Sequence, residues 1–138
     1  MEHVLFIVDD NEANNLLLQR RLEQLEYKVC TATSGEECLR RIEKIQPDLI
    51  LLDLKMPGLD GWQTIEKLKA NEKTKNFNVV AVSSTLTQDD ADRVRHAGFT
   101  AFCIKPIKVK EFIPKVKKWI QADDFDIDSV DGFDPIEL

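Results

Sequence analysis

The sequence predicts an α/β domain in which helices cover both faces of a five-stranded parallel sheet. Short apolar runs, typical of strands buried on both faces, alternate along the chain with segments whose apolar residues recur at helical spacing. Polar or charged residues also stand at the ends of the four strongest runs, and the carboxyl ends of parallel strands are where such sheets bind ligands. The alternation of strand and helix favours a parallel sheet with right-handed crossovers.

The strands are predicted from five segments. VLFIV, DLILLDL, NVVAVSS and TAFCIK are short, largely apolar runs, and YKVCTAT is a weaker candidate. In chain order, the five segments span residues 4–8, 27–33, 48–54, 78–84 and 100–105.

A helical pattern follows each strand segment. Leu18, Leu22 and Leu25 share one face of the first helix, and the other helices have similar stripes, the fourth being the weakest. The expected helices span residues 11–25, 36–45, 61–70, 88–97 and 108–120. Pro114 falls inside the last of them and should kink that helix or mark its true start.

Length and composition are those of one ordinary globular domain. The chain has 138 residues, of which 43% are hydrophobic and 32% are charged. No apolar run approaches the roughly 20 residues that a membrane-spanning helix needs, so we expect no membrane insertion. Cys30, Cys38 and Cys103 form no CxxC pair and lie in apolar contexts. We interpret them as reduced thiols in the core of a cytoplasmic protein.

Charge is distributed unevenly along the chain. The net charge is −6, but residues 122–138 hold seven acids and no base, which leaves residues 1–121 almost neutral. We therefore expect a folded domain over 1–121 and an acidic, disordered tail over 122–138. The tail could dock on the lysine-rich last helix, bind a partner, or only raise solubility. Nothing in the chain has the clustered basic surface that nucleic acid would require.

The residues at the predicted strand ends belong together chemically. Because carboxyl ends of parallel strands meet at one edge of the sheet, these side chains should converge there. Three of them are carboxylates, which cannot all be ionised at close range without a cation. The residues at these ends are Asp9, Asp10, Asp53, Ser83, Ser84 and Lys105.

A divalent cation would resolve the repulsion between the carboxylates. Mg²⁺ binds oxygen ligands and commonly combines one or two carboxylates with a phosphate. With a hydroxyl and a lysine nearby, the set suits phosphoryl transfer, in which a carboxylate can itself be the acceptor. The alternative is local: Asp9 could cap the following helix, with Asp10 as a solvated acid in its first turn.

At this point the sequence resembles the receiver domain of bacterial two-component response regulators. The matching segments are IVDDNE, LILLDLKMPGLDG, VVAVSS, AGFTAF and the dipeptide KP at 105–106. The resemblance covers residues 3 to about 121. It implies a flavodoxin-like, doubly wound (βα)5 three-layer sandwich with strand order 2-1-3-4-5.

The resemblance also implies roles for the residues at the strand ends. Asp53 corresponds to the phosphoacceptor, and Asp10 and Asp53 to direct Mg²⁺ ligands, with Asp9 acting through water. The backbone carbonyl of Lys55 would complete the metal site. Lys105 would pair with a phosphoryl oxygen, and its peptide bond to Pro106 is expected to be cis.

Further residues would form the switch. Ser83 would turn its hydroxyl towards the phosphoryl group, Ser84 would offer its backbone N–H, and Phe102 would be the switch aromatic. Serine in place of the commoner threonine lacks the methyl group that stiffens χ1. In the family, the positions of Lys55 and Thr85 influence how long the phosphoryl group survives.

Three functions compete at this stage. The leading one is a stand-alone receiver that is phosphorylated by a sensor histidine kinase or a histidine phosphotransfer protein. It would then bind an output protein through the surface formed by the fourth helix, fifth strand and fifth helix, where the lysines of the last helix suit an acidic partner. A phosphatase with an aspartate nucleophile is disfavoured because its D-x-D motif is absent after Asp9. A binding module independent of phosphorylation is disfavoured by the intact acidic residues and Lys105.

Overall fold

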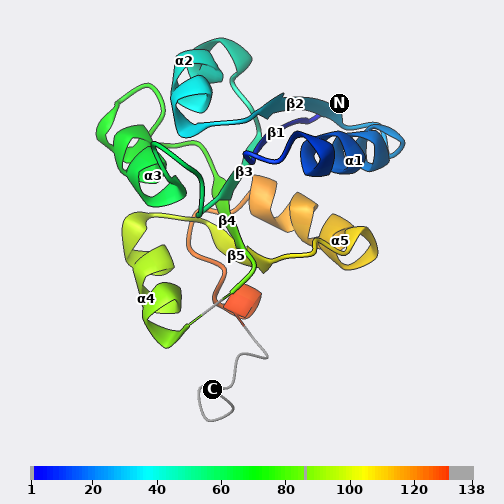
Figure 1. The fold of residues 1–138 in the computed structure, drawn as a ribbon. Coiled ribbons are helices and arrows are strands. Elements are labelled where there is room, and N and C mark those ends of the chain that lie inside the picture. The colour runs from blue at the N-terminus through cyan, green and yellow to red at the C-terminus, as the bar shows by residue number, and fades with distance from the viewer. Residues whose placement is uncertain (1, 86, 131–138) are drawn as a thin grey trace.

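The computed structural model describes residues 2–85 and 87–130 and contains five alternating pairs of strand and helix (Figure 1). The strands are β1 (Val4–Val8), β2 (Lys28–Ala32), β3 (Leu49–Asp53), β4 (Val79–Ser83) and β5 (Ala101–Ile104). The helices are α1 (Glu12–Glu23), α2 (Gly35–Ile45), α3 (Gly61–Ala70), α4 (Gln88–Ala97) and α5 (Val109–Ile120), followed by the short 3₁₀ helix η1 (Ile127–Val130). Within the described residues, no helix has the length and apolar character needed to cross a membrane.

The sheet has the order β2-β1-β3-β4-β5, and its strand pairs are all parallel. Helices α1 and α5 cover one face, and α2, α3 and α4 cover the other (Figure 1). The predicted doubly wound three-layer fold and its strand order are therefore confirmed.

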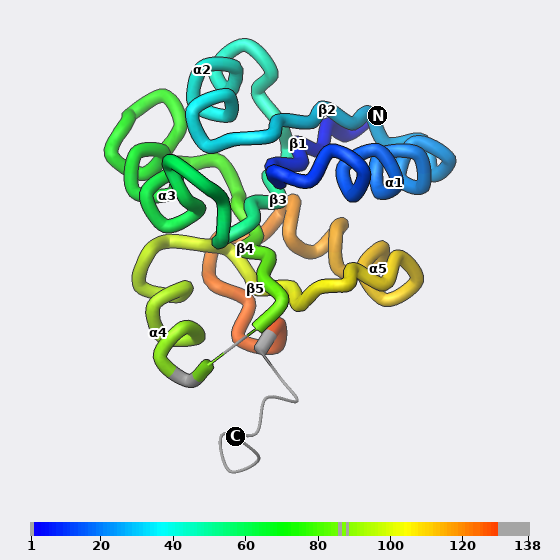
Figure 2. The backbone as a smooth tube through the Cα atoms, in the orientation of Figure 1, coloured from blue at the N-terminus to red at the C-terminus, as the bar shows by residue number. Residues whose placement is uncertain are grey.

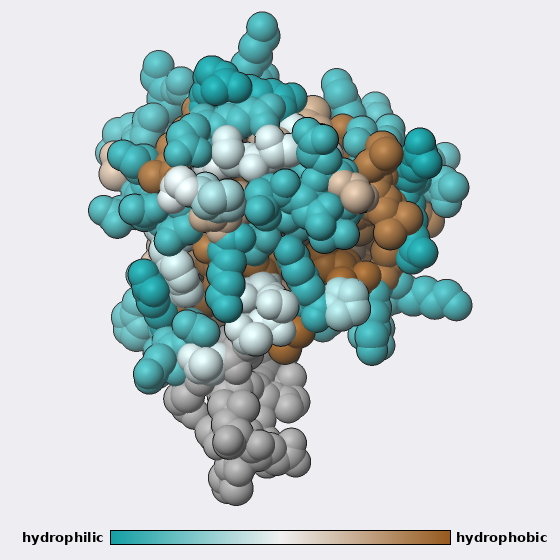
Figure 3. Space-filling model, in the orientation of Figure 1, coloured by the Kyte–Doolittle hydropathy of each residue, from teal (hydrophilic) through white to brown (hydrophobic). Residues whose placement is uncertain are grey.

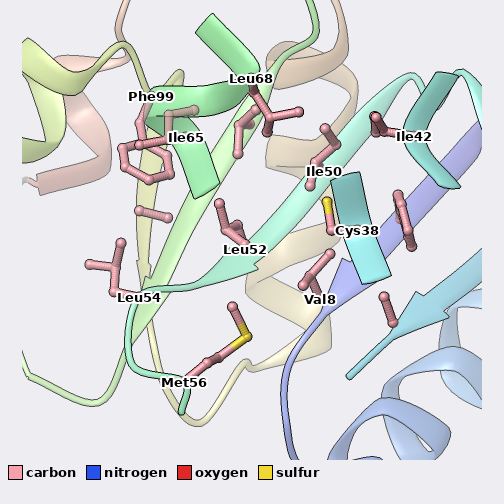
Figure 4. Close-up of a cluster of buried hydrophobic side chains, with 14 of the residues drawn as sticks. Val8, Cys38, Ile42, Ile50, Leu52, Leu54, Met56, Ile65, Leu68 and Phe99 are labelled. Atoms are coloured by element: carbon pink, nitrogen blue, oxygen red, sulfur yellow. The ribbon is translucent and has the colours of Figure 1, made fainter. Parts of the chain in front are cut away.

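Two buried clusters hold the three layers together, because successive residues of each strand point to opposite faces. On the α1–α5 face, Leu5 and Leu51 pack with Leu22, Phe112 and Trp119. The other face is shown in Figure 4, where side chains of the strands meet those of α2 and α3. The labelled residues of this second cluster include Val8, Cys38, Ile42, Ile50, Leu52, Ile65 and Leu68.

The cysteines fit the prediction of unpaired thiols. All three are free, and Cys38 lies in the second cluster, where burial raises the pKa of its thiol to about 12. Such a thiol stays protonated at neutral pH and behaves as a small apolar side chain.

Local signals in the sequence explain most element boundaries. Ser34 accepts a hydrogen bond from the backbone N–H of Glu37 and begins α2, while Gly98 adopts a left-handed conformation with φ +95° and ends α4.

Helix α1 ends at Glu23, two residues earlier than predicted. Leu25 lies in the turn that follows and is 47% exposed, so its predicted place on the buried face is wrong. Pro114 lies within α5 and does not mark its start.

Residues 122–130, which we expected to be disordered, are placed against the rest of the molecule. After α5 the chain runs back along β5 and forms η1, as the orange and red part of the tube in Figure 2 shows. The last eight residues of the expected tail lie outside the described residues.

The first residue of α3 packs directly against the end of β3. A Cβ atom added to Gly61 would lie 2.4 Å from the carbonyl oxygen of Asp53 and 2.6 Å from the Cα atom of Leu54. Both neighbours are backbone atoms that cannot rotate away. Glycine at this position therefore lets α3 start beside Asp53.

We expect Gly61→Ala to lower the free energy of unfolding by about 1–3 kcal/mol, since the methyl group overlaps fixed backbone atoms. Urea unfolding followed by circular dichroism would measure the change. A loss below about 0.5 kcal/mol, the range of an ordinary surface substitution, would show that the close approach is not a constraint.

Candidate functional site

Two neighbouring strands deliver three carboxylates to one edge of the sheet. Asp9 and Asp10 follow β1, and Asp53 is the last residue of β3, which pairs with β1. Each residue has a carboxylate oxygen within 4.8 Å of one from the other two. Asp9 and Asp53 are buried, whereas Asp10 is exposed. The predicted convergence of these side chains is therefore observed.

Lys105 lies between the two buried carboxylates. Its Nζ atom donates to Asp9 Oδ2 and to Asp53 Oδ2, both at 2.8 Å. Its backbone N–H donates to the carbonyl oxygen of Ser83, which ties the end of β5 to the end of β4. The peptide bond between Lys105 and Pro106 is cis, as predicted.

Backbone N–H groups hold both buried carboxylates in the same way. Asn11 N–H donates to Asp9 Oδ1 at 3.0 Å, and Lys55 N–H donates to Asp53 Oδ1 at 3.1 Å. The cap of α1 is Asn11, whose side chain accepts from the N–H of Asn14, so the alternative in which Asp9 caps this helix is not observed.

The electrostatics of the two buried carboxylates differ. Burial raises the pKa of Asp53, the neighbouring charge of Asp9 raises it further, and the hydrogen bonds from Lys105 and Lys55 offset only part of this. For Asp9, burial would also raise the pKa, but hydrogen bonds from Lys105 and the N–H of Asn11 outweigh burial and lower it. The two carboxylates in turn raise the pKa of Lys105 despite its partial burial, so the lysine stays charged.

Asn15 is a positioning residue that the sequence analysis missed. It is buried on α1, and its Nδ2 atom donates to the carbonyl oxygens of Asp9 and Ala32 at 2.8 and 3.2 Å. These bonds join the end of β1 to the end of β2 beneath the carboxylates. The signal was its spacing: Asn15 precedes Leu18 and Leu22 by three and seven residues, on the face of α1 that turns inward.

The residues present fit a divalent metal ion. The ammonium of Lys105 contacts two of the three carboxylates, those of Asp9 and Asp53, and the third, Asp10, is exposed to solvent. Oxygen ligands with an open side suit Mg²⁺, which keeps several of its waters. The carbonyl of Lys55 stays a prediction as a fourth ligand.

The two serines that were predicted to contact the phosphoryl group, Ser83 and Ser84, lie at the end of β4. Ser83 is buried and its Oγ atom accepts from the N–H of Thr85 at 3.4 Å, while Ser84 is exposed. The Nζ atom of Lys55 donates to Thr85 Oγ1 at 3.4 Å, so side chains beyond β3 and β4 meet. Phe102 on β5 is buried in the second cluster.

An open pocket of about 510 Å³ leads from the carboxylates along the surface between α1 and α5. Asp53, Ser84 and Lys105 line its polar end, and Leu17 and Ile107 belong to its apolar part. Leu17 is 57% exposed. Figure 3 shows hydrophobic residues gathered over α1 and between α1 and α5, on the right of this face.

Two curated response regulators are similar in sequence to this chain. Polar-differentiation response regulator DivK from Brucella ovis is 33% identical over 120 residues, which cover 87% of this chain and 98% of DivK. DivK from Brucella anthropi is 32% identical over the same shares of both chains.

Solved structures share the fold. A putative response regulator from Chloroflexus aurantiacus superposes with a TM-score of 0.81 at 28% identity, over 88% of this chain and all of that one. The receiver domain of a sensor histidine kinase from Pseudomonas aeruginosa has a TM-score of 0.79 at 26% identity, over the same shares, and was solved with a magnesium ion coordinated in its active site cleft. Chemotaxis protein CheY4 from Vibrio cholerae, at 19% identity and a TM-score of 0.81, supports the fold alone over 86% of this chain and 99% of that one.

The family model of the response regulator receiver domain matches residues 5–117, which cover the sheet from the second residue of β1 to the end of β5 and include the converging carboxylates. With this match and the DivK relatives, the chain belongs to the receiver domains of two-component response regulators.

Proposed function

We propose that this receiver domain is a switch in which Asp53 accepts a phosphoryl group from a phosphohistidine. The donor would be a sensor histidine kinase or a histidine phosphotransfer protein in the cytoplasm. The observation that carries the proposal is the environment of Asp53. The residue is only 5% exposed and lines the pocket, and its carboxylate contacts Lys105 at 2.8 Å within a cluster of three acids.

In the proposed transfer, a carboxylate oxygen of Asp53 forms a bond to phosphorus while the bond from phosphorus to the donor imidazole nitrogen breaks. The electron pair returns to the imidazole, which takes up a proton. Burial makes Asp53 a more basic carboxylate, and the N–H of Lys55 holds one of its oxygens in place. Little covalent chemistry beyond this is needed, because phosphoryl transfer depends mainly on positioning and charge neutralisation.

Lys105 and the carboxylates would divide the charge of the phosphoryl group. When bound, Mg²⁺ acts as a Lewis acid that neutralises charge on phosphoryl oxygens. Asp10 and Asp53 would hold the ion directly, Asp9 would hold it through water, and the carbonyl of Lys55 would be a further ligand. The ammonium of Lys105 donates hydrogen bonds to Asp9 and Asp53 in this structure, and it would donate one to a phosphoryl oxygen instead.

The pocket beside Asp53 supports a donor that docks through a helix. Its apolar part includes Leu17, Leu18 and Ile107, and it is continuous with the carboxylates. An amphipathic helix can lay its apolar face in such a groove, which would bring a histidine on that helix to Asp53.

Phosphorylation would be read out at β4 and β5. The Ser83 hydroxyl now bonds to the N–H of Thr85 and would exchange that bond for one to the phosphoryl group, to which Ser84 would offer its own N–H. We propose that Phe102 rearranges with Ser83 and alters the surface of α4, β5 and α5, where an output protein binds. The domain would catalyse only its own phosphorylation and dephosphorylation.

The acceptor is tested by intact-mass spectrometry after incubation with Mg²⁺ and acetyl phosphate. We expect wild type to gain one phosphoryl group and Asp53→Asn to gain none, because the amide lacks the nucleophilic oxygen. Asp92→Asn, which makes the same change at an exposed site on α4, should behave as wild type. Phosphorylation of Asp53→Asn would show that the acceptor is another residue. No gain of mass in wild type would show that a small phosphodonor cannot phosphorylate the domain directly.

The metal site is tested by thermal unfolding with and without MgCl₂. A ligand at a hundred times its dissociation constant stabilises the native state by about 2.7 kcal/mol, so Mg²⁺ should raise the melting temperature of wild type by several degrees. Asp10→Asn should lose most of this rise, because it removes a ligand without disturbing a buried contact. The matched control is Glu12→Gln, an exposed acid two residues along the chain. Equal rises in both variants would contradict the assignment of Asp10.

A further inference from the structure

The outer edge of β5 is covered by the chain itself. β5 is the last strand of the sheet, so one side of its backbone has no neighbouring strand. Residues 122–130, called here the C-terminal segment, lie along that side. Asp126 N–H donates to the carbonyl oxygen of Thr100 at 2.7 Å, and Phe102 N–H donates to Ser129 Oγ at 3.0 Å.

One carboxylate fixes the C-terminal segment to α5. Asp126 accepts hydrogen bonds from Trp119 Nε1 at 2.9 Å and from Lys118 Nζ at 3.0 Å, and its side chain is only 7% exposed. Burial would raise the pKa of Asp126, but the bonds from Trp119 and Lys118 outweigh it and lower the pKa, so the carboxylate is charged. Ser129 Oγ donates in turn to the carbonyl of Asp126 at 2.6 Å, which closes the turn that presents both residues to β5.

The contacts of the segment are specific but few. At the edge of β5, one backbone carbonyl accepts from the Asp126 N–H, and the Phe102 N–H donates to the Ser129 hydroxyl. Phe125 packs against the buried cluster that contains Phe102. Hydrogen bonds of this kind stabilise by about 1 kcal/mol each, and an ion pair to the half-exposed Lys118 adds little. Because the segment is tethered to α5, its effective concentration at the edge is on the order of millimolar, so weak contacts are enough to keep it there.

From these observations we infer that the β5 edge, with Lys118 and Trp119, is a binding site for an acidic segment that forms a tight turn, and that the C-terminal segment is its resident competitor. The site takes a carboxylate between the lysine and the indole, and a serine three residues later on the strand edge. An output partner that adds such a segment to β5 must first displace residues 122–130. Binding at this edge can be measured in the unphosphorylated protein, while its role in output rests on the proposed function.

The test uses the full chain, so that no part need fold alone. Asp126→Ala removes the bonds to Trp119 and Lys118, and Asp124→Ala is the control, because the described residues give this exposed acid no hydrogen bond or ion pair. Amide hydrogen exchange at Phe102 reports whether the edge is covered, and exchange at Val80 and Val82 of β4 reports whether the sheet is intact. In Asp126→Ala, exchange at Phe102 should be roughly tenfold faster, with β4 unchanged.

The vacated edge is then offered a labelled peptide of residues 122–130, ADDFDIDSV, without phosphodonor or Mg²⁺. We expect the peptide to bind Asp126→Ala about tenfold more tightly than wild type or Asp124→Ala, whose sites are occupied. The same peptide carrying Asp126→Ala should bind none of them.

Two results would overturn the inference. Unchanged exchange at Phe102 in Asp126→Ala would show that the carboxylate does not hold the segment on β5. Faster exchange without peptide binding up to about 1 mM would show that the bare edge is not a binding site. Because neither readout requires phosphorylation, both are separate from a failure of Asp53 to accept a phosphoryl group.

Discussion

The contact of Lys105 with Asp9 and Asp53 is the interaction on which the rest of the site depends. Two carboxylates buried side by side would repel each other and lose their hydration, and one of them would take up a proton. A single ammonium at 2.8 Å from both allows them to remain close without a metal. The third carboxylate, Asp10, is left in solvent, where it adds to the attraction for a divalent cation.

This contact also constrains the order of the strands. Lys105 follows β5, which is separated from β3 by β4, so its side chain must reach over the end of β4 to Asp53. The register of β4 and β5 pairs Ser83 with Ile104, and the Lys105 N–H bonds to the carbonyl of Ser83. The strand that carries Ser83 therefore lies between the strand of the acceptor and the strand that precedes the lysine. A change of strand order or a slip in register would separate these groups.

The sequence was sufficient for the features that depend on periodicity and strand ends. Apolar runs located the five strands, and the polar residues that follow them identified Asp9, Asp53 and Lys105. It was insufficient where a single long-range hydrogen bond decides the structure. The sequence placed Asn15 in a helix but gave it no further role, because its bonds to Asp9 and Ala32 exist only once β1 and β2 are paired.

Residues 122–130 were also misjudged, since their high charge is typical of disorder. Disorder was expected from average composition, but the placement of the segment depends on particular contacts. Asp126 meets an indole N–H and an ammonium that adjoin each other on α5, and Asn78 donates to the carbonyls of Trp119 and Ala122, which turns the chain towards β5. None of these pairings can be inferred from local pattern, because Asn78 lies more than forty residues away from the segment that it orients.

Strand β5 therefore connects the proposed phosphorylation site with the edge that the C-terminal segment covers. One end of the strand carries Lys105, and its outer edge bonds to Asp126 and Ser129. Phe102 belongs to both, with its ring in the core and its N–H on the covered edge. If phosphorylation moves the Phe102 backbone N–H as well as the ring, it changes the free energy of the C-terminal segment on β5. By linkage, the segment then changes the free energy of phosphorylation by the same amount. A cover held by a few bonds of about 1 kcal/mol each is suited to this, because a coupling of 1–3 kcal/mol is then enough to release it.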